Sequence, residues 1–472
     1  MLNSKKIKSA SIWSLLETIT ATGLGIFSII FLAKLLTPED YGMIATAQFI
    51  SGFIQIILSL GLNEVIVQKK DLKENEIQTF WIATIGISFL AFLITMVISF
   101  IFYTNNQLII SKILIFEGIN NVLIILAIVP TALLMRNLEM KSFFFRNIFS
   151  RIVFFIIAIP LALNEFGLWS IVYANLAQTL TSFILLFLVT KKLIPKKLFF
   201  DKSFFIESMR FGFFVMLESL LWSFLSRVLG LLIAIFHGTT SLGLYNMATR
   251  LTDTILNILN SSITRITLPI FSSVQDNKEK LLFAFQSSTY YFNILSMPIF
   301  FGMALTANYW IPLILGEKWN DVIPLIQIIS TMYGIMYSRM FVGIAIKALG
   351  RSKEFLYLSF IAAIITLFAV FLTKNTNLST MLLALAIPRI FITIPLGIFL
   401  MKKICKFSII EQIVPLKIPI LLGALVVMNV VFIQVFYKAN LLISLVVQIG
   451  LSLVIFLIFN LILFKLNRLK WK

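Results

Sequence analysis

Five polar residues recur at helical spacing inside an otherwise apolar stretch near the middle of the chain. They stand at i, i+4, i+7, i+11 and i+14: Asn246, Arg250, Asp253, Asn257 and Asn260. On an α-helix this spacing places them along one face. Arg250 and Asp253 can pair with each other until an anion competes for the arginine. The pattern predicts a helix lining an aqueous cleft, with Asn246, Arg250 and Asn257 as substrate-binding residues; the alternative is a hydrogen-bonded seam between packed helices.

Three further arginines, Arg227, Arg339 and Arg389, lie in apolar stretches of the second part of the chain. A charged side chain at the centre of a membrane span costs about 2.5 kcal/mol or more, so such a residue usually faces a wet cavity or a partner. We count all three as candidate anion-binding residues. For Arg339 and Arg389 the alternative is an ion pair between packed helices. By the same reading, no arginine of residues 1–202 falls inside a span.

Two glutamates, Glu17 and Glu218, occupy matching positions in two similar segments of the chain. Each lies roughly 12 Å from the start of its predicted helix, at about 1.5 Å per residue. They could bind a coupling proton or sodium ion, or pair with arginines. We group them with Asp253 as ion-coupling candidates.

The elements that carry these residues are predicted to be membrane-spanning helices. The chain has 472 residues, of which 60% are hydrophobic and 12% charged, with a mean hydropathy of +1.01, whereas soluble domains are about a quarter charged. Apolar stretches of about 20 residues, enough to cross a bilayer, recur from end to end. One cysteine and one histidine leave no Cys/His cluster for zinc and no internal disulfide.

Polar breaks divide the chain into about fourteen predicted spans. The fifth, Ile152 to Leu163, is short and follows a basic loop at 136–151. One set of alternate loops, which includes both termini, holds 29 of the 39 Lys and Arg residues, and the other set holds five. By the positive-inside rule both termini are cytoplasmic. The net charge of +19 is therefore a topology signal and does not indicate nucleic acid.

A comparison of the chain with itself at an offset of 201 residues indicates an internal repeat. Glu17 falls on Glu218 and Gly42 on Gly243. We predict an all-α polytopic membrane protein with two pseudo-symmetric six-helix lobes around a central cleft, 1–202 and 203–403, and two additional helices in 404–472. Such an arrangement is typical of transporters that work by alternating access. A duplication kept only for stability is the alternative.

Two motifs carry a family resemblance. The segment Leu-Leu-Thr-Pro-Glu-Asp-Tyr-Gly at 35–42 and the segment Leu-Gly-Leu-Tyr-Asn-Met-Ala-Thr-Arg-Leu at 242–251 resemble bacterial polysaccharide transporters of the Wzx type. These belong to the multidrug/oligosaccharidyl-lipid/polysaccharide (MOP) exporter superfamily, which has a MATE-like fold. Arg250 matches the motif arginine, and the chain departs from the family pattern at Asn63-Glu64.

The resemblance implies a flippase in the bacterial cytoplasmic (inner) membrane. It would move undecaprenyl-diphosphate-linked oligosaccharide repeat units to the outer leaflet for O-antigen, capsule or exopolysaccharide synthesis. It would be no enzyme and would need no cofactor beyond a possible coupling H⁺ or Na⁺. Its partners would be the lipid-linked oligosaccharide, membrane lipids, and a polysaccharide polymerase or other glycan-assembly proteins.

Three alternatives stay open at this point. A cation-coupled multidrug exporter of the same superfamily is disfavoured by the excess of arginines. A lipid II flippase would differ only in its cargo. A membrane enzyme of glycan assembly is disfavoured because the predicted external loops are short, none exceeding about thirteen residues.

Overall fold

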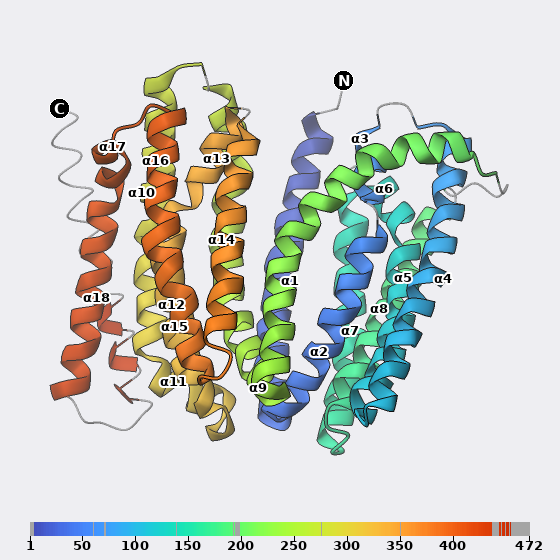
Figure 1. The fold of residues 1–472 in the computed structure, drawn as a ribbon, viewed down its shortest axis with the longest axis horizontal. Coiled ribbons are helices and arrows are strands. Elements are labelled where there is room, and N and C mark those ends of the chain that lie inside the picture. The colour runs from blue at the N-terminus through green and yellow to red at the C-terminus, as the bar shows by residue number, and fades with distance from the viewer. Residues whose placement is uncertain are drawn as a thin grey trace. The chain divides into compact units, whose positions relative to one another are not determined.

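The protein is helical throughout the part that the structure describes (Figure 1). The computed structural model describes residues 4–59, 61–69, 72–137, 139–191, 193, 199–274, 276–349, 351–436, 443–444, 446–448, 450–452 and 454. The chain divides into two compact units, Met1–Asn246 and Met247–Lys472, called here the first and second unit.

The first unit contains eight helices and the beginning of a ninth. They are α1 (Ser4–Leu35), α2 (Pro38–Ser59), α3 (Leu62–Gln68), α4 (Glu74–Thr104), α5 (Leu108–Leu126), α6 (Ile128–Arg136), α7 (Met140–Leu163), α8 (Trp169–Thr190) and α9 (Lys202–Ser273). Helix α4 packs on α5, α7 on α8, α1 on α7 and α2 on α5. The short helices α3 and α6 pack together through a buried apolar cluster that includes Leu62, Ile66 and Val129.

The turn between α1 and α2 shows why the Thr-Pro-Glu-Asp segment begins a helix. The backbone N–H and the hydroxyl of Thr37 donate to Asp40 Oδ2 at 2.9 and 2.8 Å, and the Asp40 N–H donates to Thr37 Oγ1 at 3.2 Å. This is a capping box with proline at the first helical position, where its missing N–H costs nothing. The motif therefore stops one span and starts the next within two residues.

Helix α9 is two helices joined at Gly238, which has φ +85° and ψ 169°. Only glycine adopts this backbone conformation without strain. Just beyond this break, Gly243 packs against the start of α2 within the first unit. A Cβ on Gly42 would lie 1.8 Å from the Thr239 carbonyl oxygen, and a Cβ on Gly243 would lie 1.8 Å from the Pro38 carbonyl oxygen. Both contacts are related by the predicted 201-residue offset.

The second unit continues α9 and adds the remaining described helices. They are α10 (Lys278–Leu305), α11 (Ala307–Leu315), η1 (Glu317–Val322), α12 (Ile323–Met336), η2 (Tyr337–Arg339), α13 (Met340–Ala348), α14 (Ser352–Leu372), α15 (Leu378–Pro388), η3 (Arg389–Thr393), α16 (Ile394–Ile404), α17 (Ile409–Ile413), η4 (Val414–Leu416) and α18 (Lys417–Phe436). Helices α10 and α11 meet at a bend of 75°. Buried phenylalanines such as Phe285, Phe292 and Phe341 form the core.

Ten helices among the described residues are long and apolar enough to cross a membrane, or eleven when the bent pair α10 and α11 counts as one span. The chain is therefore a multi-pass membrane protein. The predicted total of about fourteen stays a prediction, and most of the last predicted span lies outside the described residues. The division at 202 and 403 stays a prediction as well.

Candidate functional site

Helix α7 corrects the sequence analysis of the first unit. It begins at Met140, so residues 140–151 of the predicted loop form its first turns, and the candidate span is Met140–Leu163 instead of Ile152–Leu163. Arg146 and Arg151 therefore lie inside a membrane-spanning helix. The expectation that the first 202 residues hold no arginine within a span is wrong, because the basic residues of this segment were counted as a loop.

Arg146 is linked to the predicted ion-coupling residue Glu17 through one amide. The Nε and Nη2 groups of Arg146 donate to Asn147 Oδ1 at 3.2 and 3.0 Å, and Asn147 Nδ2 donates to Glu17 Oε1 at 2.5 Å. Arg146 also lies 4.7 Å from the centroid of the Phe143 ring. Among the described residues, the Nη1 group of Arg146 has no hydrogen-bond acceptor. The guanidinium is thus held in place from one side.

Arg151 forms a second contact between α7 and α1. Its Nη1 group donates to the Ala21 carbonyl oxygen at 2.9 Å, and the same nitrogen lies 3.7 Å from the position of a Cβ on Gly25. A Cβ at Gly25 would be in ordinary van der Waals contact with this nitrogen. Helix α1 therefore offers α7 a carbonyl oxygen for Arg151 and, through Asn147, the Glu17 carboxylate for Arg146.

A polar cavity of about 380 Å³ lies beside Arg146 within the first unit. Its polar lining comes from α3, α6, α7 and α8, and consists of Asn63, Thr131, Arg146, Asn147, Ser150, Gln178, Thr179 and Ser182. The Asn63 Oδ1 atom is buried and accepts no hydrogen bond from the described residues. A buried amide oxygen without a donor is costly, so this cavity is suited to a ligand that brings hydroxyl groups.

The half-buried carboxylate of Glu117 lies on α5, which packs against α2. Ser51 Oγ lies 3.4 Å from Glu117 Oε2 and 3.1 Å from Asn121 Oδ1, and Asn121 Nδ2 donates to the Ser51 carbonyl oxygen at 3.3 Å. All these groups sit in helices that span the membrane. The neutral amide and hydroxyl partners satisfy the glutamate in either protonation state.

Only some residues of the predicted polar face of α9 form side-chain contacts with the described part of the chain. Arg250 and Asn257 are exposed, and Asp253 accepts a 2.6 Å hydrogen bond from the Tyr333 hydroxyl. Within the described part of the chain, Arg250 and Asp253 form no ion pair with each other. Asn246, at the end of the first unit, is half-buried.

Arg389 is bound to a hydroxyl of α14 in the second unit. Its Nε and Nη2 groups donate to Thr366 Oγ1 at 3.1 and 2.9 Å, and Tyr337 is within electrostatic reach of both Arg389 and Asp253. Pro388, which has no N–H, precedes the π-helical turn η3, and Arg389 is the first residue of this wider turn. The helix is therefore irregular beside Arg389.

Arg339 has a different environment. Its Nη2 group donates to Gln412 Oε1 at 2.5 Å, and Gln412 in turn donates to the carbonyl oxygens of Ile398 and Phe407. The Arg339 Nε group is buried without an acceptor among the described residues. This arginine ties η2 to α17. The side chains of the remaining candidates, Glu218 and Arg227, lie outside the description.

The amides and hydroxyls of α7 and α8 that line the polar cavity were not among the candidate site residues predicted from the sequence. A signal for them was present: Asn147 and Arg151 stand at i and i+4, as do Arg146 and Ser150, and Gln178 and Ser182. These spacings place polar groups on common helix faces. The basic residues Lys141, Arg146 and Arg151 concealed the part of this pattern that lies on α7, because hydropathy averaging ends a span wherever charges gather.

The chain is similar to known proteins over most of its length. The polysaccharide biosynthesis protein family (Polysacc_synt_3) matches residues 31–324. The lipopolysaccharide biosynthesis protein WzxC of Escherichia coli K12 is 24% identical over 76% of this chain and 72% of its own length. The teichuronic acid biosynthesis protein TuaB of Bacillus subtilis 168 is 23% identical over 69% of this chain and 68% of its own.

Solved structures share the fold at lower identity. The lipid II flippase MurJ, in an inward closed conformation, has a TM-score of 0.76 at 14% identity and covers 96% of this chain and 99% of its own. An inward-facing MATE-family multidrug transporter of the MOP superfamily has a TM-score of 0.60 at 13% identity, over 84% of this chain and 99% of its own. The predicted MATE-like MOP fold is confirmed.

Proposed function

The chain belongs to the polysaccharide biosynthesis protein family, and from that membership we propose that it is a flippase for lipid-linked oligosaccharide repeat units. It moves units carried on undecaprenyl diphosphate from the cytoplasmic to the outer leaflet, for the assembly of O-antigen, capsule or exopolysaccharide. Relatives named for lipopolysaccharide biosynthesis, teichuronic acid biosynthesis and succinoglycan transport support this function.

The polar cavity of the first unit is the observation that carries the proposal. It combines a guanidinium with amides and hydroxyls inside membrane-spanning helices, where polar groups are costly and mark a transport path. Guanidinium groups bind phosphate oxygens through paired hydrogen bonds, and amide and hydroxyl groups bind sugars. A lipid-linked glycan presents both kinds of partner together.

The transport cycle needs no covalent step. We propose alternating access, and the residues predicted from the sequence to bind the substrate stay candidates for contacts with the diphosphate at some stage of the cycle: Arg227, Asn246, Arg250, Asn257, Arg339 and Arg389. Glu17, Glu218 and Asp253 are the proposed sites for a coupling H⁺ or Na⁺. The support for Asp253 is that, among the described residues, only its Oδ1 atom accepts a hydrogen bond, from the Tyr333 hydroxyl, which leaves the other oxygen for an ion.

The proposal includes the cellular setting. The chain lies in the bacterial cytoplasmic membrane with both termini on the cytoplasmic side, as its distribution of basic residues indicates. Its partners are membrane lipids, a polysaccharide polymerase and other glycan-assembly proteins.

A reconstituted flipping assay tests the function. Purified protein is placed in liposomes that hold a fluorescently labelled, polyprenyl-diphosphate-linked oligosaccharide on the inner leaflet, and exposure of the sugar is followed with an external glycosidase. We expect the wild type to expose the substrate and Arg146→Gln to slow exposure about tenfold or more. Lys112→Gln, which removes an exposed lysine of α5, is the matched control and keeps the wild-type rate.

The same liposomes separate the alternatives. Exposure of lipid II alone identifies a lipid II flippase, and transport of cationic dyes without exposure of any glycan identifies a drug exporter. Either result overturns the proposed function.

A further inference from the structure

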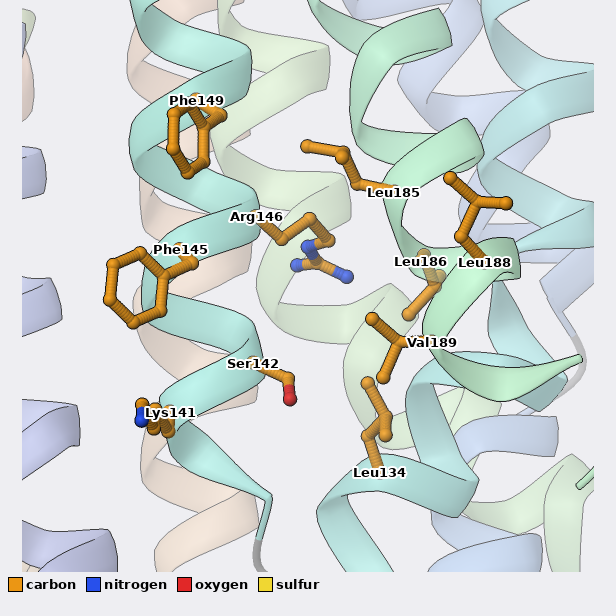
Figure 2. A pocket seen from close by; sticks show the side chains of 10 residues that line it. All are labelled: Leu134, Lys141, Ser142, Phe145, Arg146, Phe149, Leu185, Leu186, Leu188 and Val189. Carbon is orange, nitrogen blue, oxygen red and sulfur yellow. The ribbon is translucent and has the colours of Figure 1, made fainter. Parts of the chain in front are cut away.

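A second cavity of the first unit, about 320 Å³ in volume, lies between α7 and α8 (Figure 2). It is lined by Leu134, Lys141, Ser142, Phe145, Arg146, Phe149, Leu185, Leu186, Leu188 and Val189, and we call it the outer groove. Apart from three polar residues, its walls are aliphatic and aromatic. It is therefore suited to a hydrocarbon chain.

The outer groove opens to the surface that faces lipid. Phe145 is 40% exposed, Phe149 52%, Leu188 54% and Val189 52%, although each lies on a helix that spans the membrane. Large apolar side chains at such positions contact lipid tails. A chain that lies in the bilayer can therefore enter the groove without crossing water.

Polarity changes along the groove. Lys141 and Ser142 lie in the first turn of α7, and Phe149 lies about 12 Å farther along the helix at ~1.5 Å per residue. Figure 2 shows Lys141 and Ser142 at one end, Phe149 at the other, and the Arg146 guanidinium between them, directed toward Leu186 on α8. An amphiphile with its anionic group at the lysine end matches this gradient.

The two cations of the groove are not paired directly with an acid, and the Glu17 carboxylate reaches Arg146 only through the Asn147 amide. Lys141 Nζ lies 5.8 Å from the centroid of the Trp13 ring, and Arg146 is bound by the neutral Asn147 amide. Neither forms an ion pair with the described residues. An anion in the groove would therefore gain a charge-assisted contact with Arg146, and Lys141 adds a second positive charge to the same lining.

Arg146 is the one residue that lines both the outer groove and the polar cavity. A ligand that fills both must carry an apolar chain on one side of the guanidinium and a polar group on the other. A phospholipid of the surrounding bilayer would account for the groove and leave the polar cavity unexplained. A lipid diphosphate that bears a sugar accounts for both.

We propose that the outer groove between α7 and α8 binds the lipid end of the substrate, with the diphosphate at Arg146 and Lys141 and the first isoprenoid units along Phe149, Leu185 and Leu188. The sugar then lies in the polar cavity beyond Arg146. This inference rests on the proposed function and deepens it, because it assigns the lateral position at which the carrier lipid is held.

Site-specific photo-crosslinking tests the position. A photoreactive phenylalanine analogue replaces Phe149 in one protein and Phe100 in another; Phe100 is 65% exposed on α4 and is the matched control. The probe is undecaprenyl diphosphate without sugar, in nanodiscs of zwitterionic lipid. We expect the probe to crosslink at position 149 and only at background level at position 100. Equal crosslinking at both positions would overturn the proposal.

The charge requirement is tested with the same probe. We expect Arg146→Gln and Lys141→Gln each to weaken probe binding about tenfold, Arg146→Lys to restore part of it, and Lys112→Gln to leave it unchanged. Unfolding temperatures of all variants check that they are folded. Free pyrophosphate should compete weakly, because it lacks the chain. If phosphatidylglycerol competes as well as the probe, the groove is a site for bulk lipid and the inference is wrong.

The flipping assay and the crosslinking experiment can overturn the proposed function and the proposed outer groove independently of each other. Wild-type protein that exposes glycan in the flipping assay but does not crosslink at position 149 overturns the outer groove alone. Protein that crosslinks at position 149 but exposes no glycan overturns the proposed function and leaves a binding site for a lipid diphosphate.

Discussion

At the scale of single residues, the Asn147 amide connects two charged residues of the first unit, Arg146 and Glu17. Asn147 uses its oxygen for Arg146 and its nitrogen for Glu17. The arginine and the glutamate therefore belong to one network without a direct ion pair. Charges separated by a neutral amide keep part of their hydrogen-bonding capacity for a ligand, whereas a closed pair would spend it on each other.

We expect Asn147→Leu to destabilise the protein by about 1–3 kcal/mol, because it leaves a donor and an acceptor unsatisfied in an apolar environment. The midpoint of thermal unfolding in detergent measures this. Asn175→Leu on α8 is the control, and Glu17→Gln, which keeps an acceptor for the amide, should cost less than Asn147→Leu. An equal loss in all three variants would contradict the network.

At the scale of elements, helix starts depend on local capping that the sequence encodes. Asp201 precedes α9, and its Oδ1 accepts hydrogen bonds from the Ser203 hydroxyl at 2.6 Å and from the Phe204 N–H at 3.0 Å. The Ser203 hydroxyl and the Phe204 N–H lower the pKa of Asp201 below its ordinary value of 3.8. The carboxylate therefore stays charged at the start of the helix.

A lowered pKa in the folded state means that Asp201 stabilises the helix start above the ordinary pKa and loses this effect as the pH falls through the lowered pKa. We expect Asp201→Ala to speed amide hydrogen exchange at residues 203–205 at neutral pH, and Asp201→Asn to restore most of the protection, since asparagine also caps helices. Exchange rates unchanged by Asp201→Ala would rule out the cap.

Also at this scale, the close approach of Gly42 and Gly243 joins the start of α2 to the segment after Gly238. A methyl group at either position would overlap a carbonyl oxygen at 1.8 Å, which forces the backbones apart. We expect Gly42→Ala and Gly243→Ala each to cost about 1–3 kcal/mol, as measured by thermal unfolding. Gly86→Ala on α4, where a Cβ meets nothing within 4 Å, should be neutral or stabilising. Equal effects at all three positions would contradict the close contact.

At the scale of the whole molecule, each unit presents apolar side chains outward, as expected for a protein in lipid. Phe89 and Phe100 of the first unit are 63% and 65% exposed, and Phe432 and Phe436 of the second unit are 62% and 72% exposed. In water such surfaces would cause aggregation. Most of the surplus of basic residues is predicted to lie in loops and termini, where it would orient the chain, whereas Lys141, Arg146 and Arg151 lie in α7.

Cysteine labelling tests this orientation. The single native thiol, Cys405, is buried, and burial raises its pKa to about 12, so it should not react with maleimide at neutral pH. We expect Lys112→Cys to be labelled by an impermeant maleimide in intact cells, and Lys73→Cys only after permeabilisation. The reverse pattern would place the termini outside the cytoplasm.

The sequence by itself determined the properties that depend on neighbouring residues. Runs of apolar side chains specify helices that span the membrane, the Thr37 to Asp40 segment specifies a helix start, and the 201-residue offset relates Gly42 to Gly243, which the structure brings into contact. These features are local or repeated in the chain. They can therefore be read without knowledge of the packing.

Only the tertiary structure decided which polar groups meet. Glu17 and Asn147 are 130 residues apart, and Asn63 reaches the same cavity as Gln178 because α3 packs on α6. The energetic cost of placing Arg146 and Arg151 in a span is offset by partners on α1 and on α7 itself. A hydropathy average cannot include the distant partners, so it assigned these arginines to a loop, whereas the structure places them in a helix that is long and apolar enough to span the membrane.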